Sequence, residues 1–270
     1  MNVQDIIKQY DAMLQEGQWN EAGAFLKEQV DSEENPLSAR VSANNELIGC
    51  YRELRQDEAC YKQCRQQMEW MNQLQTIDGE TAGTLLLNIA NAFREIGMHQ
   101  EAQDVFARTE ELYENVLETQ DYRRAGLYNN YSLCMLELEQ YAEAEQYARK
   151  ALDVIKAQKE AYLEEAVTYQ NLSSIALKQE KIKDACELIE RAYQILVSHE
   201  LEDSYQAGTI LSNLAYVYSS IGFYKEAMEY YNRAADIAYH YTGESPYYFQ
   251  ILANIKTLKN KLPDDFCENC

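Results

Sequence analysis

The stretch from Asn213 to Ala227, NLAYVYSSIGFYKEA, decides the fold of this chain, because its pattern recurs along the sequence. The stretch from Asn88 to Ala102, NIANAFREIGMHQEA, has Asn, Ala, Gly and Ala at the same offsets. Three further copies also place an Ala 14 residues after an Asn, at Asn45–Ala59, Asn130–Ala144 and Asn171–Ala185. One motif therefore accounts for most of the chain.

The spacing of the copies predicts a repeat protein made of helices. The alanines lie 37, 43, 42, 41 and 42 residues apart, at Ala22, Ala59, Ala102, Ala144, Ala185 and Ala227. The first copy is degenerate, with Lys8 at the place of the Asn. Within a copy, apolar or small residues recur at helical spacing, as in Leu211, Leu214, Ala215 and Tyr218. Gly97 and Gly222 stand where a first helix must end, because glycine accepts a positive φ.

The pattern therefore predicts an all-α fold, a right-handed α-solenoid of about six helix-turn-helix pairs with a capping helix over 247–261. We expect one solenoid domain over residues 1–262 and a C-terminal tail over 263–270. The expected repeats span about 3–30, 38–75, 81–118, 123–157, 162–198 and 204–241. The expected helices lie near 3–15, 18–30, 38–54, 57–75, 81–96, 99–118, 123–138, 141–157, 162–179, 182–198, 204–221, 224–241 and 247–261.

The motif, with its Leu/Ile-Ala pair and its turn residue followed by Ala, resembles the tetratricopeptide repeat family. The resemblance covers nearly the whole chain and is strongest from about Thr81 to Tyr241. The usual repeat has about 34 residues, whereas most copies here are near 42 residues long, so each helix is longer by roughly one turn. Copies with Leu-x-Asn-Leu-Ala, as at Leu211–Ala215, look most like the kinesin light chain subclass and the repeat halves of bacterial peptide-sensing regulators.

The column of asparagines is the strongest candidate for a binding site. Two residues along a helix correspond to about 200° of rotation, so each Asn points away from the small residue that packs inside. First helices line the concave face of such a stack, so the asparagines form a ladder along a groove. A carboxamide both donates and accepts, which suits an extended peptide main chain. The resemblance implies the same role, since matching asparagines in similar proteins hold the ligand main chain. The column comprises Asn45, Asn88, Asn130, Asn171 and Asn213.

A structural role for the same asparagines remains open. Asn is a middling helix former, about 0.6 kcal/mol less favourable than Ala, so five equivalent positions need a reason. Each side chain could instead bond to the neighbouring helix and set the stacking geometry. Both roles can hold in different repeats.

Positions one turn beyond the column predict the specificity of the groove. Asn91 and Tyr216 follow an Asn of the column by three residues and are candidates for peptide contact. A further turn brings charges of both signs to the edge, at Arg52, Glu95, Glu137 and Lys178, and residues such as Asn44 precede the column. Chaperone-binding members of the family clamp a terminal carboxylate with Lys, Arg and Asn. The chain has Thr84, Asn88, Gly126 and Asn130 at those places, which argues against that function.

The charge balance limits the class of partner. The chain has 24 Lys and Arg against 45 Asp and Glu, a net charge of −21. Nucleic acid and anionic membranes repel such a chain, and neutral or basic peptide segments suit it. It contains no apolar run long enough for a transmembrane helix, and its first residues do not resemble a signal peptide. We therefore expect a cytoplasmic protein.

The cysteines and the remaining motifs predict neither catalysis nor a cofactor or metal. Cys60 and Cys64 lie four residues apart, and Cys267 and Cys270 form a terminal C-x-x-C, whereas a tetrahedral zinc site needs four ligands. The sequence shows no nucleophile elbow and no phosphate-binding loop. The expected function is non-enzymatic binding of a peptide or protein segment. The alternative is a structural scaffold or homo-oligomer that uses its convex face or its ends, with an empty groove.

Overall fold

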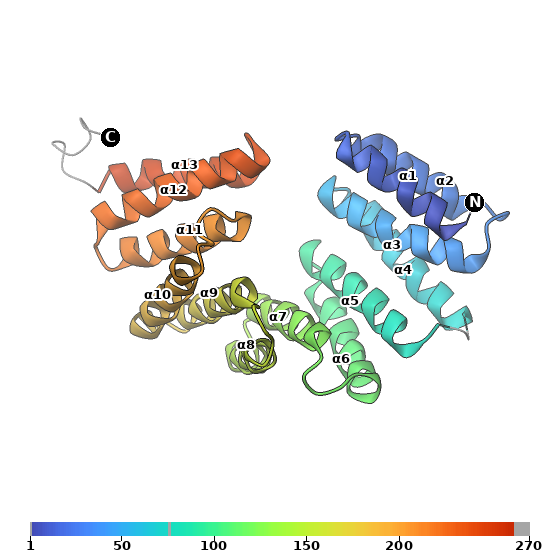
Figure 1. Cartoon of the computed structure of the whole chain (residues 1–270), viewed down its shortest axis with the longest axis horizontal. Coiled ribbons are helices and arrows are strands. Elements are labelled where there is room, and N and C mark those ends of the chain that lie inside the picture. The colour runs from blue at the N-terminus through green and yellow to red at the C-terminus, as the bar shows by residue number, and fades with distance from the viewer. Residues whose placement is uncertain (1, 75–76, 262–270) are drawn as a thin grey trace. The chain divides into compact units, whose positions relative to one another are not determined.

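The computed structural model describes residues 2–74 and 77–261. Within these residues the chain forms thirteen α-helices and no strand (Figure 1), so the predicted all-α class is confirmed. Odd-numbered helices are the first helices of the pairs and even-numbered helices are the second. They are α1 (Val3–Gln15), α2 (Trp19–Asp31), α3 (Leu37–Glu53), α4 (Asp57–Gln73), α5 (Gly79–Glu95), α6 (His99–Val116), α7 (Tyr122–Glu137), α8 (Tyr141–Lys156), α9 (Tyr162–Lys178), α10 (Ile182–Ser198), α11 (Tyr205–Ser220), α12 (Tyr224–Thr242) and α13 (Pro246–Lys259).

First and second helices begin differently. Side-chain oxygens cap the amino termini of five first helices by accepting a bond from a backbone N–H two or three residues later, at Asn2, Asp78, Asp121, Ser204 and Ser245. The second helices start without a side-chain cap, directly after a tight turn. The turn itself therefore determines where each second helix begins.

The turn within a pair needs one residue in the left-handed conformation. Gly97 and Gly222 provide it with φ of 81° and 90°, as the sequence predicts. Glu139 and Glu180 adopt φ near 60° in two other pairs, where a side chain makes the left-handed conformation less favourable.

The second pair corrects the register expected from the alanine spacing. Its left-handed turn residue is Arg55, which lies five residues before Cys60, as Gly97 lies five before Ala102. Cys60 is fully buried, whereas Ala59 is partly exposed. The expected place of Ala59 in the buried series is therefore wrong by one residue. The structure buries Ala22, Ala102, Ala144, Ala185 and Ala227 completely.

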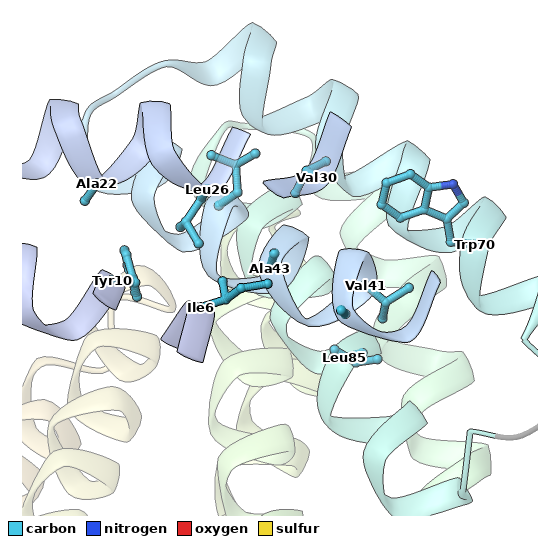
Figure 2. Packing of buried hydrophobic residues seen from close by; sticks show 11 residues of the cluster. Ile6, Tyr10, Ala22, Leu26, Val30, Val41, Ala43, Trp70 and Leu85 are labelled. Atoms are coloured by element: carbon cyan, nitrogen blue, oxygen red, sulfur yellow. The ribbon is translucent and has the colours of Figure 1, made fainter. Parts of the chain in front are cut away.

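The chain divides into two compact units, Met1–Leu138 and Glu139–Cys270, and each is described here by itself. The expected single domain and its repeat limits stay predictions. In the first unit, apolar side chains of α1, α2 and α3 pack together, and Trp70 of α4 and Leu85 of α5 extend the cluster. Figure 2 shows Ile6, Tyr10, Ala22, Leu26, Val30, Val41, Ala43, Trp70 and Leu85 in this cluster.

In the second unit, α11 lies between two apolar clusters. One face, with Ile210 and Leu214, packs with Ile189 and Leu196 of α10. The opposite face packs on α12, and α13 covers α12 with Ile251, Ile255 and Leu258. The C-terminal helix is thus present, over Pro246–Lys259 rather than 247–261. Among the described residues, no helix is both long enough and apolar enough to cross a membrane.

Candidate functional site

The asparagines of the column lie on first helices, and neighbouring first helices touch each other within each unit. In the first unit α1 contacts α3, α3 contacts α5, and α5 contacts α7; in the second, α9 contacts α11. Equivalent side chains on neighbouring first helices are therefore close enough to interact directly. This proximity decides which asparagines are already engaged in the fold.

Asn45 and Asn88 bind each other. The Asn88 Nδ2 donates to the Asn45 Oδ1 over 3.0 Å, across 43 residues of sequence. The Asn45 Nδ2 in turn donates to the Glu46 Oε1 at 3.1 Å. Both residues are partly buried. The pair thus joins α3 to α5, which is the structural role that the sequence left open.

The other three asparagines of the column differ among themselves. Asn171 is buried, with 6% of its surface exposed, and its side chain interacts within the fold. Asn130 on α7 and Asn213 on α11 are partly exposed, and neither forms a hydrogen bond with another described residue. The column is therefore not one uniform ladder: its free carboxamides are those of Asn130 in the first unit and Asn213 in the second.

The two residues expected one turn further along have different surroundings. Asn91 on α5 is partly buried, and its buried Oδ1 has no hydrogen-bond partner among the described residues. Tyr216 on α11 is 57% exposed and lies one turn after Asn213. Asn213 and Tyr216 thus bring a free carboxamide and an exposed ring to one face of one helix.

Tyrosines from three helices of the second unit surround this face. Burial raises the pKa of Tyr231 on α12 to about 12, with Tyr216 and Tyr247 adding to the shift and Asn254 opposing it. Burial likewise raises the pKa of Tyr247 on α13 to about 12, and the Ser212 hydroxyl opposes that shift. These phenols therefore stay neutral at physiological pH and offer aromatic surface rather than charge.

The charged edge expected along the first helices is already paired in the first unit. Arg52 donates to both carboxylate oxygens of Glu95, at 2.9 and 2.6 Å. Arg94 donates to Glu137 at 2.9 Å, and the His99 Nδ1 lies 3.2 Å from the same carboxylate. Each Arg thus reaches the Glu of the next first helix, 43 residues on. In the second unit Lys178 is exposed, and no described residue forms an ion pair with it.

Asn44 lies away from the column that it precedes in sequence. It is fully buried, and its Nδ2 donates to the Gln63 carbonyl at 3.0 Å and to the Gln67 Oε1 at 2.8 Å. Gln67 then donates to the Val41 carbonyl at 3.0 Å. This network joins α3 to α4 inside the pair. The sequence alone did not separate this inward amide from its neighbour Asn45.

The described part of the chain offers little chemistry for catalysis or metal binding. Its residues contain no group of three His, Cys, Asp or Glu side chains that could hold a metal ion. Cys60 and Cys64 are buried free thiols, and the C-x-x-C of Cys267 and Cys270 lies outside the described residues. A pocket of about 280 Å³ between α8, α9 and α10 is lined by apolar and charged side chains, and its lining includes no Ser, Cys or His.

Comparisons with known proteins agree with this architecture. The tetratricopeptide repeat family model matches residues 123–198 and 164–240. No curated protein matches the chain. The structure of kinesin light chain repeats from Podosopora anserina superposes with a TM-score of 0.62 at 16% identity, covering 74% of this chain and 95% of that one.

Two further solved structures share the fold. BtubC (BKLC) from P. vanneervenii has a TM-score of 0.66 at 18% identity, with coverage of 84% of this chain and 94% of that chain. The apo form of RapI has a TM-score of 0.65 at 13% identity and covers 96% of this chain, which spans 71% of RapI. Residues 123–240 carry tetratricopeptide repeats, and the chain is a tetratricopeptide repeat protein that resembles kinesin light chain repeats and the peptide-sensing repeat proteins.

Proposed function

We propose that this chain binds an extended peptide segment on its first-helix faces, through carboxamides that the fold does not use. Tetratricopeptide repeats are in general a scaffold for protein or peptide interaction. The observation that carries the finer proposal is the free carboxamide of Asn213 one turn from the exposed ring of Tyr216. An amide of this kind can donate to one peptide carbonyl and accept from one peptide N–H. Asn130 offers the same group in the first unit.

The expected ligand is neutral or basic and carries an aromatic or apolar side chain. The net charge of −21 attracts cationic segments and repels acidic ones. The tyrosines beside Asn213 provide apolar surface with few charged groups, which suits a ring or an aliphatic side chain. Asn91, with its unpartnered Oδ1, is a second place for a peptide N–H in the first unit. We propose no catalytic role. The free thiols of the described cysteines suit the expected cytoplasmic location.

Selection from a phage-displayed library of random 12-residue peptides tests this proposal. Selected sequences should be neutral or basic, and synthetic copies should bind the chain in calorimetric titration. A Tyr216→Ala variant should bind them at least severalfold more weakly, because the ring loses its contact area. The exposed Tyr122→Ala on α7 is the matched control and should bind normally. Failure to enrich any peptide, or equal binding by the Tyr216 variant, contradicts the proposal.

A second candidate function is a structural scaffold with an empty groove. The Asn45–Asn88 bond and the bidentate Arg52–Glu95 pair favour it, because both use first-helix side chains to join neighbouring helices. If scaffolding is the whole function, the free amides of Asn130 and Asn213 have no ligand. The peptide selection then yields no binder that depends on the first-helix face.

A further inference from the structure

The outer face of α13 differs from the equivalent face of α11. α11 packs on α12 through Leu211 and Ala215, and a Cβ added at Gly208 would lie 3.0 Å from the Ile237 Cγ2. The Asn254 register places Phe249, Leu252, Lys256 and Lys259 at the positions of Gly208, Leu211, Ala215 and Tyr218. Phe249 is 52% exposed, and both lysines are exposed. α13 therefore has no room for a second helix at the close distance seen between α11 and α12.

A cleft of about 370 Å³ runs between α12 and α13 beside this face. Its walls include Asn232, Asp236 and Tyr239 of α12 and Tyr248 and Leu252 of α13. Tyr239 is 56% exposed and its ring centroid lies 5.4 Å from that of Tyr248. The cleft thus combines an apolar floor with an exposed aromatic end.

The two helices that form the cleft carry opposite charges. The wall residues of α12 continue by helical spacing to the exposed Glu229, which makes its stripe acidic. α13 has no acidic residue, and its stripe ends in Lys256 and Lys259. None of Glu229, Asp236, Lys256 and Lys259 forms an ion pair with a described residue. Acidic and basic stripes therefore lie on either side of the cleft, with their charges unpaired.

The antiparallel packing of α12 and α13 fixes the relative heights of these groups. Tyr239 meets Tyr248 at one end, and the Lys261 Nζ lies 5.6 Å from the centre of the Tyr224 ring at the other. Counting inward from both contacts puts Glu229 level with the segment from Lys256 to Lys259. Figure 1 shows the two helices side by side at the C-terminal end of the second unit.

We propose that this α12–α13 face binds the same face of a second copy of the chain, related by a two-fold axis parallel to the helices. Such an axis preserves height and places α12 of each copy over α13 of the other. Glu229 of one copy then faces Lys256 and Lys259 of the other, and Tyr239 packs against Phe249. The charges favour this arrangement over α13 on α13, which would bring two basic stripes together.

The size of the face predicts a weak dimer. α13 has 14 residues, so the face is about 21 Å long at 1.5 Å per residue and about two helix diameters wide. Such a face buries less than the roughly 800 Å² per partner of a standard interface. Dimers should therefore form at tens to hundreds of micromolar, as expected for a weak interface.

Complementary charge reversal tests the proposal through sedimentation velocity from 5 to 500 µM protein in 150 mM salt. Glu229→Lys alone and Lys259→Glu alone should each weaken dimerisation by roughly tenfold or more, because each puts two like-charge pairs into the interface. Mixing the two variants should restore dimers, since each variant then supplies what the other lacks. The double variant Glu229→Lys with Lys259→Glu should also dimerise alone.

Two controls keep the outcome decisive. Glu58→Lys and Lys62→Glu reverse an exposed pair on α4 of the first unit and should leave dimerisation unchanged. A chain shortened after Lys261 should dimerise like the full chain. The proposal is overturned if the wild type stays monomeric at 500 µM, or if the mixed variants form no dimer. It is also overturned if only the shortened chain dimerises, because the tail is then the occupant of the cleft.

Discussion

Gly83 should be among the positions where the fold tolerates a methyl group least. It lies on α5, and an added Cβ would be 2.2 Å from the Cε1 and 2.7 Å from the Cδ1 of Tyr113 on α6. Tyr113 is 1% exposed, so the ring has no open space into which it can move. Ala is the better helix former by about 1 kcal/mol, and overpacking a core costs about 1–3 kcal/mol. Since the overlap here exceeds 1 Å, we take the upper end of that range and expect Gly83→Ala to lose about 2 kcal/mol.

Thermal unfolding followed by circular dichroism measures this loss, with a fall in Tm of roughly 4–8 °C at about 2–4 °C per kcal/mol. Gly49→Ala on α3 and Gly126→Ala on α7 are matched controls, because nothing lies within 4 Å of a Cβ at either position. Both controls should be stabilised by up to about 1 kcal/mol through helix propensity. A Gly83→Ala chain as stable as the wild type would refute the packing of α5 on α6 described above.

Three more predictions concern turns, cores and pH. Glu180→Gly should raise stability by roughly 0.5–1 kcal/mol, because Glu180 has φ of 60° and Gly adopts that conformation without strain; a lower midpoint in urea unfolding would contradict this. Ala144→Leu should cost about 1–3 kcal/mol, because Ala144 is fully buried where two helices meet, and an unchanged melt would count against that packing. At alkaline pH the second unit should lose stability: burial raises the pKa of Tyr231 and Tyr247 from 10.0 to about 12, so their contribution is complete below pH 10 and disappears as pH rises through 12. Spectrophotometric titration of the phenolates at 295 nm should show these late ionisations, and Tyr247→Phe should remove one; titration of every tyrosine near pH 10 is the contrary result.

The sequence predicts the helices well because the repeat motif contains their periodicity and their turns. All thirteen expected helices are present, and Gly97 and Gly222 show the positive φ that their places require. The register of the second pair fails by one residue, because Cys60 fills the buried place and Arg55 replaces the turn glycine. Neither substitution resembles the motif in one-letter code, although both satisfy its geometry.

The candidate site could be predicted only in part, because hydrogen-bond partners depend on distances between helices. The spacing places Asn45, Asn88 and Asn213 in one column, yet two of them bind each other and the third is free. The same limit applies to Arg52, whose partner Glu95 lies 43 residues away in sequence. Periodicity assigns a face to each side chain, and only the packing of neighbouring first helices assigns its partner.

The most direct test of the central claim pairs calorimetric titration with thermal melts on three variants. The ligand is a peptide selected as described above. Asn213→Ala or Asn130→Ala should weaken its binding by about 0.5–1.5 kcal/mol, or roughly two- to tenfold, while Tm stays level or rises slightly. Asn88→Ala should instead lower Tm, because it removes the bond to Asn45. If both the Asn213 and Asn130 variants lose stability and keep full affinity, the free amides belong to the fold and the peptide-binding claim is wrong.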